Sequence, residues 1–152
     1  MKKVLFVCLG NICRSPMAEG IFKHKIEALG QENMISSDSA GTAAYHIGED
    51  PDPRTMITLD KHGISFSHAA RKAKKEDAEE FDYILAMDLQ NYRDLKSLLP
   101  DQYDGLFKMR DFDLLDKGAD VPDPYYGGDD GFEKVFEMLD RSIGHFIKEK
   151  LT

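Results

Sequence analysis

The chain has 152 residues, of which 41% are hydrophobic and 32% charged. These values suit one globular domain and argue against disordered, collagen-like and coiled-coil classes. The net charge of -8 argues against a general nucleic-acid binder, and two cysteines are too few for a disulfide framework or a structural zinc site. No apolar run approaches the roughly 20 residues that a membrane-spanning helix needs.

The first predicted element is a strand formed by the apolar run Val4-Leu5-Phe6-Val7. A continuous apolar run is typical of a strand that is covered on both faces, as in a parallel sheet. Lys2 and Lys3 followed by apolar residues imitate a secretory signal, but the run is shorter than the roughly 7–15 residues of a signal core. We therefore expect a buried strand and a cytoplasmic protein. Thiols stay reduced in that compartment, so a pair of cysteines suggests chemistry.

Helices and strands alternate along the rest of the chain. We predict a helix that begins at Ser15-Pro16, with Ser15 as its N-cap, and ends near Gly30. Further strands are predicted at 34–39, 81–87 and 106–109, and further helices after Asp52, at 76–80, after Asp88 and from Phe132 onward. This alternation predicts an α/β fold with a parallel sheet, in a single domain that spans residues 1–152.

The segment between the first strand and the first helix, Cys8-Leu9-Gly10-Asn11-Ile12-Cys13-Arg14-Ser15, carries the most informative pattern. The spacing from Cys8 to Arg14 leaves about enough backbone to curl around one tetrahedral anion with N–H groups pointing inward. Gly10 and Asn11 tolerate the left-handed angles that such a curl needs. The helix start adds the positive end of its dipole, and Arg14 can hold two oxygens of the anion.

The same surroundings act on Cys8. Helix N-termini and nearby cations favour a thiolate, so we expect Cys8 to be ionised at neutral pH and to lie under the bound anion. Ser15 is placed to hydrogen-bond the sulfur and to ease its later departure. The alternative is a small buried apolar side chain at a strand end. The loop lacks Gly-Lys-Ser/Thr, so a single small phosphoryl group is the expected ligand rather than a nucleotide.

A thiolate that accepts a phosphoryl group needs a proton donor for the leaving oxygen. Asp123, in Val121-Pro122-Asp123-Pro124-Tyr125-Tyr126, is the best candidate because two prolines restrict its backbone within a long loop. The alternative is an acidic turn residue without a catalytic role.

Charge is unevenly distributed along the chain. Basic residues outnumber acidic ones in residues 1–30, whereas acidic residues predominate in residues 101–140. An anionic group is therefore drawn to the first loop despite the negative total. The basic cluster of Arg71, Lys72, Lys74 and Lys75 is interpreted as a solvated face, with a partner-binding site as the alternative.

These motifs resemble those of low-molecular-weight protein tyrosine phosphatases. The resemblance covers essentially the whole chain and rests on CLGNICRS at 8–15, DSAGT at 38–42, HGISFSHAAR at 62–71, FDYILAMD at 81–88 and DPYY at 123–126. It implies a single-domain three-layer sandwich with a four-stranded parallel twisted sheet flanked by helices. It also implies hydrolysis of phosphotyrosine in proteins or peptides through a cysteinyl-phosphate intermediate, without metal or cofactor. Phosphate and other oxyanions are implied as inhibitors, with neither nucleic acid nor membrane as a partner.

The resemblance also implies roles for individual residues. Cys8 is the nucleophile, Arg14 binds the phosphoryl group, and Asp123 protonates the leaving phenol and then activates water. Asn11, through hydrogen bonds to Ser39 and His68, keeps the loop in its strained shape. The implied phosphate- and substrate-binding residues are Leu9, Gly10, Asn11, Ile12, Cys13 and Ser15 of the loop, with Tyr45, Tyr125 and Tyr126 as walls of a cleft for a phenyl ring.

Two further roles concern regulation. Cys13 matches a second loop cysteine that can trap oxidised Cys8 as a disulfide and protect it from irreversible oxidation. Tyr125 and Tyr126 match a tyrosine pair that can itself be phosphorylated.

Three other functions compete with this interpretation. An arsenate reductase with a thiol relay needs two downstream cysteines, and none follows Cys13. The related protein-arginine phosphatases carry threonine in place of Ile12, and a bulky apolar Ile12 favours an aryl phosphate. A phosphoprotein-binding module or redox sensor without turnover could dispense with a nucleophile or acid, but Cys8, Arg14 and Asp123 are all present.

Overall fold

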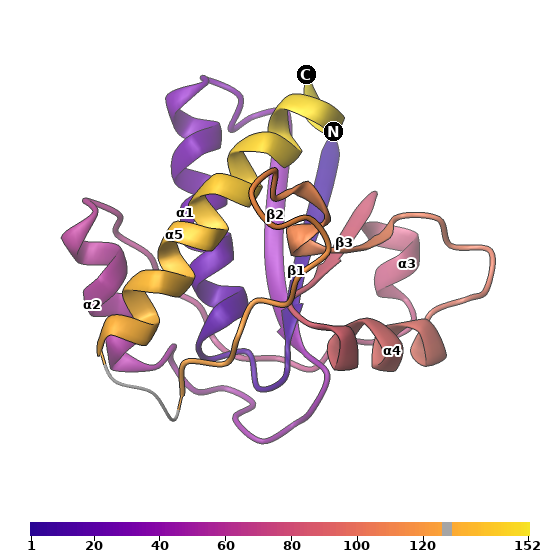
Figure 1. Ribbon diagram of the computed structural model, residues 1–152. Coiled ribbons are helices and arrows are strands. Elements are labelled where there is room, and N and C mark those ends of the chain that lie inside the picture. The colour runs from indigo at the N-terminus through magenta and orange to yellow at the C-terminus, as the bar shows by residue number, and fades with distance from the viewer. Residues whose placement is uncertain (126–128) are drawn as a thin grey trace.

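A computed structural model describes residues 1–125 and 129–152 (Figure 1). The strands are β1 (Lys2–Cys8), β2 (Ile35–Gly41), β3 (Tyr83–Ala86) and β4 (Leu106–Lys108). The helices are α1 (Arg14–Ala28), α2 (Pro53–Lys61), α3 (Asp77–Glu80), α4 (Leu89–Leu98) and α5 (Asp129–Phe146), with a 3₁₀ turn η1 (Met109–Phe112) and a π-helical turn η2 (Ile147–Leu151). The strands pair in parallel as one four-stranded sheet in the order β2-β1-β3-β4.

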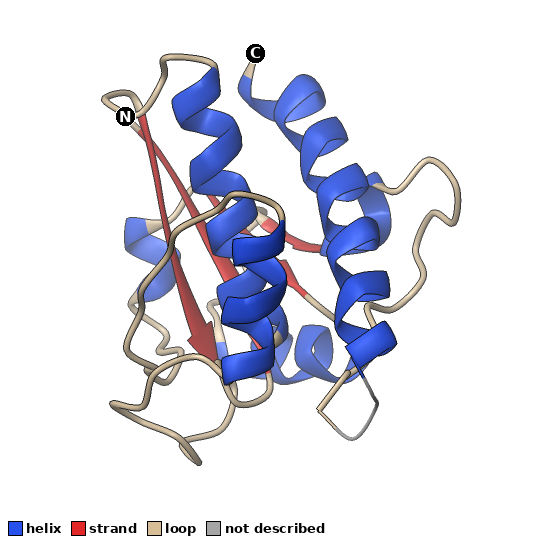
Figure 2. Cartoon of the chain, turned by 90° about the vertical axis from the view of Figure 1, so that its left-hand side faces the viewer, coloured by secondary structure: helices blue, strands red, loops and turns tan. Residues whose placement is uncertain are grey.

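Side chains of β1 alternate between two apolar cores. Val4 and Phe6 pack into the core beneath α1 and α5, whereas Leu5 and Val7 pack into the core beneath α4. Figure 1 shows α1, α2 and α5 on one side of the sheet and α3 and α4 on the other. Figure 2, which views the molecule from the side of α1 and α5, shows long helices in front of the strands. The predicted α/β class and the three-layer, four-stranded parallel sheet are confirmed.

Helix ends follow the sequence signals in two cases and depart from them in one. The Asp52 carboxylate accepts a hydrogen bond from the Arg54 N–H, and Asp88 caps α4 in the same way. The predicted N-cap at Ser15 is wrong, because α1 begins at Arg14 and Cys13 occupies the cap position without a side-chain cap bond. Ser15 lies inside the helix, and its hydroxyl faces the sulfur of Cys8 instead.

The carboxyl ends of the strands lie at the same edge of the sheet. Cys8 pairs with Gly41 of β2, and Val7 pairs with Ala86 of β3. The chain leaves β1 toward β2 on one side, whereas β3 lies on the other side of β1. Parallel sheets bind ligands in the crevice that opens where the strand order reverses in this way. The loop after Cys8 occupies that position.

The long acidic segment that follows η1 is held to α5 by one buried carboxylate. Asp113 is fully buried and accepts hydrogen bonds from Arg110 Nε at 2.9 Å and from Arg141 Nε and Nη2 at 2.8 and 2.9 Å. It also accepts a bond from the backbone of Leu115. Within the described ranges, no helix is long and apolar enough to cross a membrane.

We predict that Asp113→Asn lowers the free energy of unfolding by about 3 kcal/mol near neutral pH, because it leaves two guanidinium groups facing a neutral side chain. The hydrogen bonds from Arg141 hold the pKa of Asp113 well below its usual range. The carboxylate therefore stabilises the folded chain above its unfolded pKa of about 4, and this contribution fades as the pH falls further. Equilibrium urea unfolding as a function of pH measures this change.

Asp116→Asn is the matched control. Asp116 also faces Arg110, at 3.5 Å, but its side chain is 68% exposed. Exposed pairs contribute about 0–1 kcal/mol, so this variant should stay close to wild type. Equal losses in the two variants, or a loss in Asp113→Asn that persists in acid, would contradict the role of Asp113.

Candidate active site

The loop after β1, residues 9–13, forms a tight curl between the end of β1 at Cys8 and the start of α1 at Arg14. Cys8 is the last residue of β1 and is buried, with 3% of its surface exposed. The curl is anchored from outside by the backbone amides of Thr42, Ala43 and Asp52, which donate to the carbonyls of Cys8, Leu9 and Ile12. The loop is thereby fixed to the chain that follows β2 and to the start of α2.

Asn11 carries the unusual backbone angle that the curl needs. Among the described residues it is the only non-glycine residue with a positive φ, at 57°. Its side-chain nitrogen donates to Ser15 Oγ at 2.8 Å and to Ser39 Oγ at 3.1 Å. Its side-chain oxygen accepts from His68 Nε2 at 2.8 Å and from the Arg71 backbone N–H at 3.0 Å. The side-chain amide is fully bonded, and these bonds stabilise a left-handed conformation that costs energy at a residue other than glycine.

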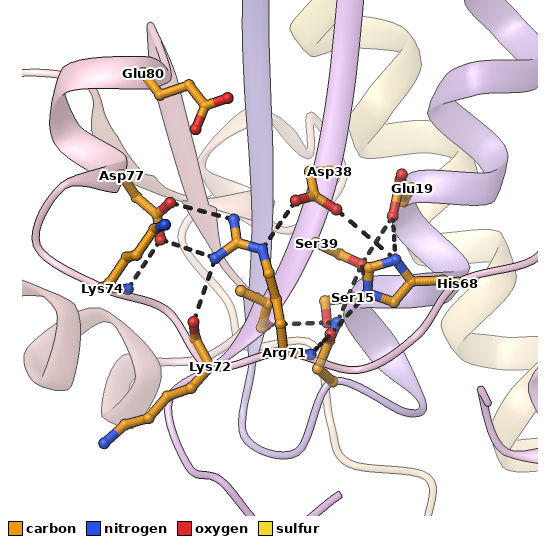
Figure 3. A network of polar contacts seen from close by, with 12 residues as sticks. Ser15, Glu19, Asp38, Ser39, His68, Arg71, Lys72, Lys74, Asp77 and Glu80 are labelled. Atoms are coloured by element: carbon orange, nitrogen blue, oxygen red, sulfur yellow. Dashed lines mark hydrogen bonds and ion pairs between the residues drawn. The ribbon is translucent and has the colours of Figure 1, made fainter. Parts of the chain in front are cut away.

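The partners of Asn11 are themselves held by two carboxylates (Figure 3). The amide oxygen of Asn11 can only accept, so Nε2 of His68 carries a hydrogen. Nδ1 of His68 faces Glu19 at 3.5 Å and Asp38 at 3.7 Å, and the hydroxyl of Ser39 donates to Glu19 at 2.8 Å. Burial raises the pKa of Glu19. The expected hydrogen bonds of Asn11 with Ser39 and His68 are therefore present.

The sulfur of Cys8 has one close polar side-chain neighbour among the described residues. Cys8 Sγ lies 3.1 Å from Ser15 Oγ, inside the buried start of α1. Asn11 donates to the same oxygen, so the hydroxyl proton of Ser15 can point toward the sulfur or toward the Ala40 carbonyl at 3.3 Å. Ser15 can thus stabilise negative charge on the sulfur, as expected from its place in the loop.

Arg14 places a buried positive charge beside the loop. Its side chain is only 3% exposed, and Nη1 donates to Asp88 at 2.7 Å and to the Val121 carbonyl at 3.0 Å. Burial opposes the charged form, but the interactions of the guanidinium with Cys8 and Asp88 outweigh it and raise the pKa of Arg14. Nη2 lies 3.8 Å from the carboxylate of Asp123. Arg14 therefore joins the loop after β1 to Asp123.

These groups line one cleft with a volume of about 190 Å³. Its floor is formed by Cys8, Arg14 and the loop, and Asp123 lies at its side, with a carboxylate oxygen bonded to the Tyr125 N–H at 3.0 Å. Tyr45 and Tyr125 are 71% and 39% exposed and form part of its wall. Among residues 1–125 and 129–152, the lining is formed by Cys8, Leu9, Gly10, Ile12, Cys13, Arg14, Tyr45, His46, Asp123 and Tyr125. Tyr126, the remaining predicted wall residue, lies outside the described residues.

Cys13 has surroundings that differ from those of Cys8. It is buried at the N-cap of α1, and burial together with the charge of Asp52 raises its pKa to about 12. The thiol of Cys13 therefore stays protonated at neutral pH. Both cysteines lie within the described ranges and are free thiols.

Several residues of the site could not be recognised from the sequence. Asp88 was predicted only as a helix cap, yet one of its oxygens also binds Arg14. Its position directly after β3 was the available signal, because neighbouring parallel strands end at the same edge. His46 and Glu19 had no such signal, since each is brought to the loop only by the folded chain.

One cluster in the described part of the chain has ligand atoms spaced as in a metal site, namely Glu19, Asp38 and His68. Each member already has protein partners. Glu19 pairs with Lys23 and Ser39, Asp38 pairs with an arginine, and His68 is bonded to Asn11. The cluster is thus part of the network that supports the loop.

Comparison with known proteins identifies the family. The family model for low molecular weight phosphotyrosine protein phosphatase matches residues 3–152. A low molecular weight protein-tyrosine-phosphatase from Streptomyces coelicolor is 44% identical over 142 residues, which cover 91% of this chain and 87% of that protein. The crystal structure of a protein tyrosine phosphatase from Entamoeba histolytica with Hepes in its active site has a TM-score of 0.94 and 41% identity, covering 98% of this chain and 96% of that one.

A more distant solved structure bears on the competing functions. It is a mutant of the YwlE arginine phosphatase with a phosphorylated active-site serine, and it has a TM-score of 0.87 and 28% identity over 98% of this chain and 97% of its own. The fold is thus shared by phosphatases named for two different substrates. Because the family model spans nearly the whole chain and the Streptomyces relative is 44% identical, the chain belongs to the low molecular weight phosphotyrosine protein phosphatase family and is an enzyme of the protein-tyrosine-phosphatase class.

Proposed function

We propose that residues 1–152 form one catalytic domain that hydrolyses phosphotyrosine in proteins or peptides through a phosphate ester of Cys8. The observation that carries the proposal is the buried sulfur of Cys8 beside the Ser15 hydroxyl and within the field of the Arg14 guanidinium. The loop from Leu9 to Cys13 would bind the phosphoryl oxygens through its backbone N–H groups, and Arg14 would bind two of them.

In the first step, the thiolate of Cys8 attacks phosphorus and the bond from phosphorus to the tyrosine oxygen breaks. The Asp123 carboxylic acid gives its proton to the leaving phenolate. Arg14 and the loop amides stabilise the charge on the transferring group, which is where preorganised donors contribute most. The products are free tyrosine side chain and a phosphorylated Cys8.

In the second step, the Asp123 carboxylate takes a proton from water, and the water oxygen attacks phosphorus. The sulfur–phosphorus bond breaks, phosphate leaves, and Cys8 returns to a thiolate that the Ser15 hydroxyl stabilises. The phosphorylated active-site serine in the YwlE mutant supports a phosphoenzyme in this fold. The Hepes in the Entamoeba structure supports binding of oxyanions at the same place.

The cleft favours a flat aromatic ester. Cys8 lies at its buried floor, whereas Tyr45 and Tyr125 form walls near the surface. A phenyl ring can span that depth and stack against the tyrosines, and a phosphoserine side chain is too short to do both. The apolar side chain of Ile12 also lines the cleft and favours an aryl group over a guanidinium.

Cys13 has a protective role in this proposal. When a peroxide oxidises Cys8 to a sulfenic acid, the thiol of Cys13 displaces water from that sulfur and forms a disulfide, which a thiol reductant can reverse. A reducing compartment such as the cytoplasm keeps both thiols free, and we place the enzyme there.

We predict that Cys8→Ser lowers turnover of p-nitrophenyl phosphate by more than about 10³-fold, because a serine hydroxyl is not ionised at neutral pH. Binding of phosphate or vanadate, measured by calorimetry, should persist because the loop and Arg14 remain. Cys13→Ser makes the same change of atom in the same loop and should keep turnover within about tenfold of wild type. Substantial turnover by Cys8→Ser would refute the nucleophile.

We predict that Asp123→Ala slows hydrolysis of phenyl phosphate by about 10²–10⁴-fold but slows aryl esters with good leaving groups much less, because only a poor leaving group needs the proton. The measurement is kcat against leaving-group acidity. Asp123→Asn is the matched control, since it keeps an oxygen for the Tyr125 N–H but has no acidic proton. Full activity in Asp123→Asn would reduce Asp123 to a structural residue.

We predict that the wild type hydrolyses phosphotyrosine peptides with kcat/KM at least about 10²-fold above phosphoserine and phosphoarginine peptides. Ile12→Thr should lower the ratio of kcat/KM for phosphotyrosine peptides to kcat/KM for phosphoarginine peptides, because it adds a hydroxyl to the cleft wall. Ile12→Val has nearly the same shape without the hydroxyl and should keep the preference. A wild type that prefers phosphoarginine would overturn the substrate class.

A further inference from the structure

Lys72, Lys74 and Lys75 are exposed, as the predicted solvated face requires, but the Arg71 side chain is only 28% exposed and is bonded to two carboxylates. Its guanidinium bonds the Asp38 carboxylate through Nε at 2.9 Å and the two oxygens of Asp77 through Nη1 and Nη2 at 3.2 Å each. Asp77 is the first residue of α3 and only 1% exposed, and Asp38 lies on β2. Figure 3 shows the guanidinium between the two carboxylates. Arg71 therefore joins α3 to β2.

The backbone of Arg71 contacts the loop of residues 9–13, which is proposed to bind the phosphoryl group and is called the phosphate loop below. Its N–H donates to the side-chain oxygen of Asn11 at 3.0 Å, and its carbonyl accepts from the Gly41 N–H at 2.8 Å. The Ala73 N–H then donates to the Gly41 carbonyl at 2.7 Å, and Lys72 forms a parallel bridge with Gly41. The segment from Arg71 to Ala73 thus extends the sheet beside the end of β2.

Asn11 depends on one stretch of chain for both bonds to its side-chain oxygen. The oxygen accepts from the Arg71 N–H and from His68 Nε2, three residues earlier. The Arg71 guanidinium holds this stretch to Asp38 and Asp77. A shift of the stretch would release the amide of Asn11, whose φ of 57° relies on its bonds.

The simultaneous contacts to Asp38 and Asp77 require the shape of the arginine guanidinium. A planar fork can bond one carboxylate in a bidentate manner and still direct Nε at a second. Lysine places one charge at one point and cannot serve Asp38 and Asp77 with the same geometry.

We propose that Arg71 is a positioning residue for catalysis. Its side chain fixes the backbone N–H of Arg71 that donates to Asn11, and thereby holds Asn11 and the phosphate loop in the shape that binds phosphate. The proposal rests on the proposed function of the loop. Arg71 does not line the cleft, so its effect on turnover is indirect, through the bond of its backbone N–H to Asn11.

The test compares Arg71→Met with Arg141→Met. Both substitutions keep an apolar stem and remove a guanidinium that pairs with a buried aspartate, Asp77 in one case and Asp113 in the other. The two arginine side chains are similarly exposed, at 28% and 34%. Arg141 lies on α5 and donates both its Nε and Nη2 bonds to Asp113, which is not a residue of the phosphate loop. Stability loss should therefore be comparable, whereas the effect on the loop should differ.

We expect Arg71→Met to lower kcat for p-nitrophenyl phosphate by about 10- to 100-fold, because a small misplacement of binding groups has effects of that size. The inhibition constant of phosphate should rise, and alkylation of Cys8 by iodoacetamide should slow. Arg141→Met should change these three quantities by less than about threefold at a similar urea midpoint. Relative to Arg71→Met, Arg71→Lys should restore the urea midpoint closer to the wild-type value than it restores kcat.

Equal kinetic effects in Arg71→Met and Arg141→Met would overturn the positioning role. If Arg71→Met does not fold, Asp77→Asn keeps the shape of the buried partner and removes its charge, and the same comparison applies with Asp113→Asn. Phosphate binding separates this proposal from the proposed function. Turnover by Cys8→Ser would refute the nucleophile, whereas unchanged phosphate affinity in Arg71→Met or Asp77→Asn would refute the role of Arg71.

Discussion

The guanidinium of Arg14 is a nearly buried positive charge, and the architecture of the site follows from the need to compensate it. A buried charge is costly unless it is paired and hydrogen-bonded. Asp88 supplies the pairing from the start of α4, and the Val121 carbonyl supplies a further acceptor from the long acidic segment. Two separate parts of the chain therefore converge on one side chain of α1. The guanidinium is thereby held in the lining of the cleft.

The second constraint is the left-handed backbone at Asn11. A residue other than glycine adopts this conformation at a cost of roughly 1–3 kcal/mol, so the fold has to stabilise it. Ser15 and Ser39 do so from α1 and β2, and His68 and Arg71 do so from the chain after α2. The shape of the anion-binding curl thus depends on side chains that lie outside the cleft lining.

These two constraints explain why the charge of the whole molecule says little about its ligand. The chain is acidic overall, at -8, yet its cleft carries a buried arginine and the positive end of α1. Many of the acidic residues are engaged elsewhere. Asp113 joins η1 to α5 by accepting hydrogen bonds from both. Asp120 forms an ion pair with Lys108 and accepts a hydrogen bond from the first backbone N–H of α4. Asp77 forms an ion pair with Arg71.

The succession of strands and helices could be predicted from the sequence, because β1 is an uninterrupted apolar run and Asp52 and Asp88 have local capping signals. The start of α1 could not be predicted to the residue. Ser15 has the chemistry of an N-cap, but a buried sulfur nearby offered its hydroxyl a different partner. The solvated face assigned to Arg71 failed for the same reason, since its partners Asp38 and Asp77 become neighbours only after folding.

The curl that precedes α1 could be predicted from the order of residues alone, since Cys8, Asn11, Arg14 and Ser15 lie within eight consecutive positions with a spacing that suits it. The groups that support the loop emerged only with the folded chain. His68 binds Asn11 from 57 positions away, Arg71 from 60, and Asp88 binds Arg14 from 74. A local pattern cannot encode such pairs, because the sheet order and the packing of its loops bring them together.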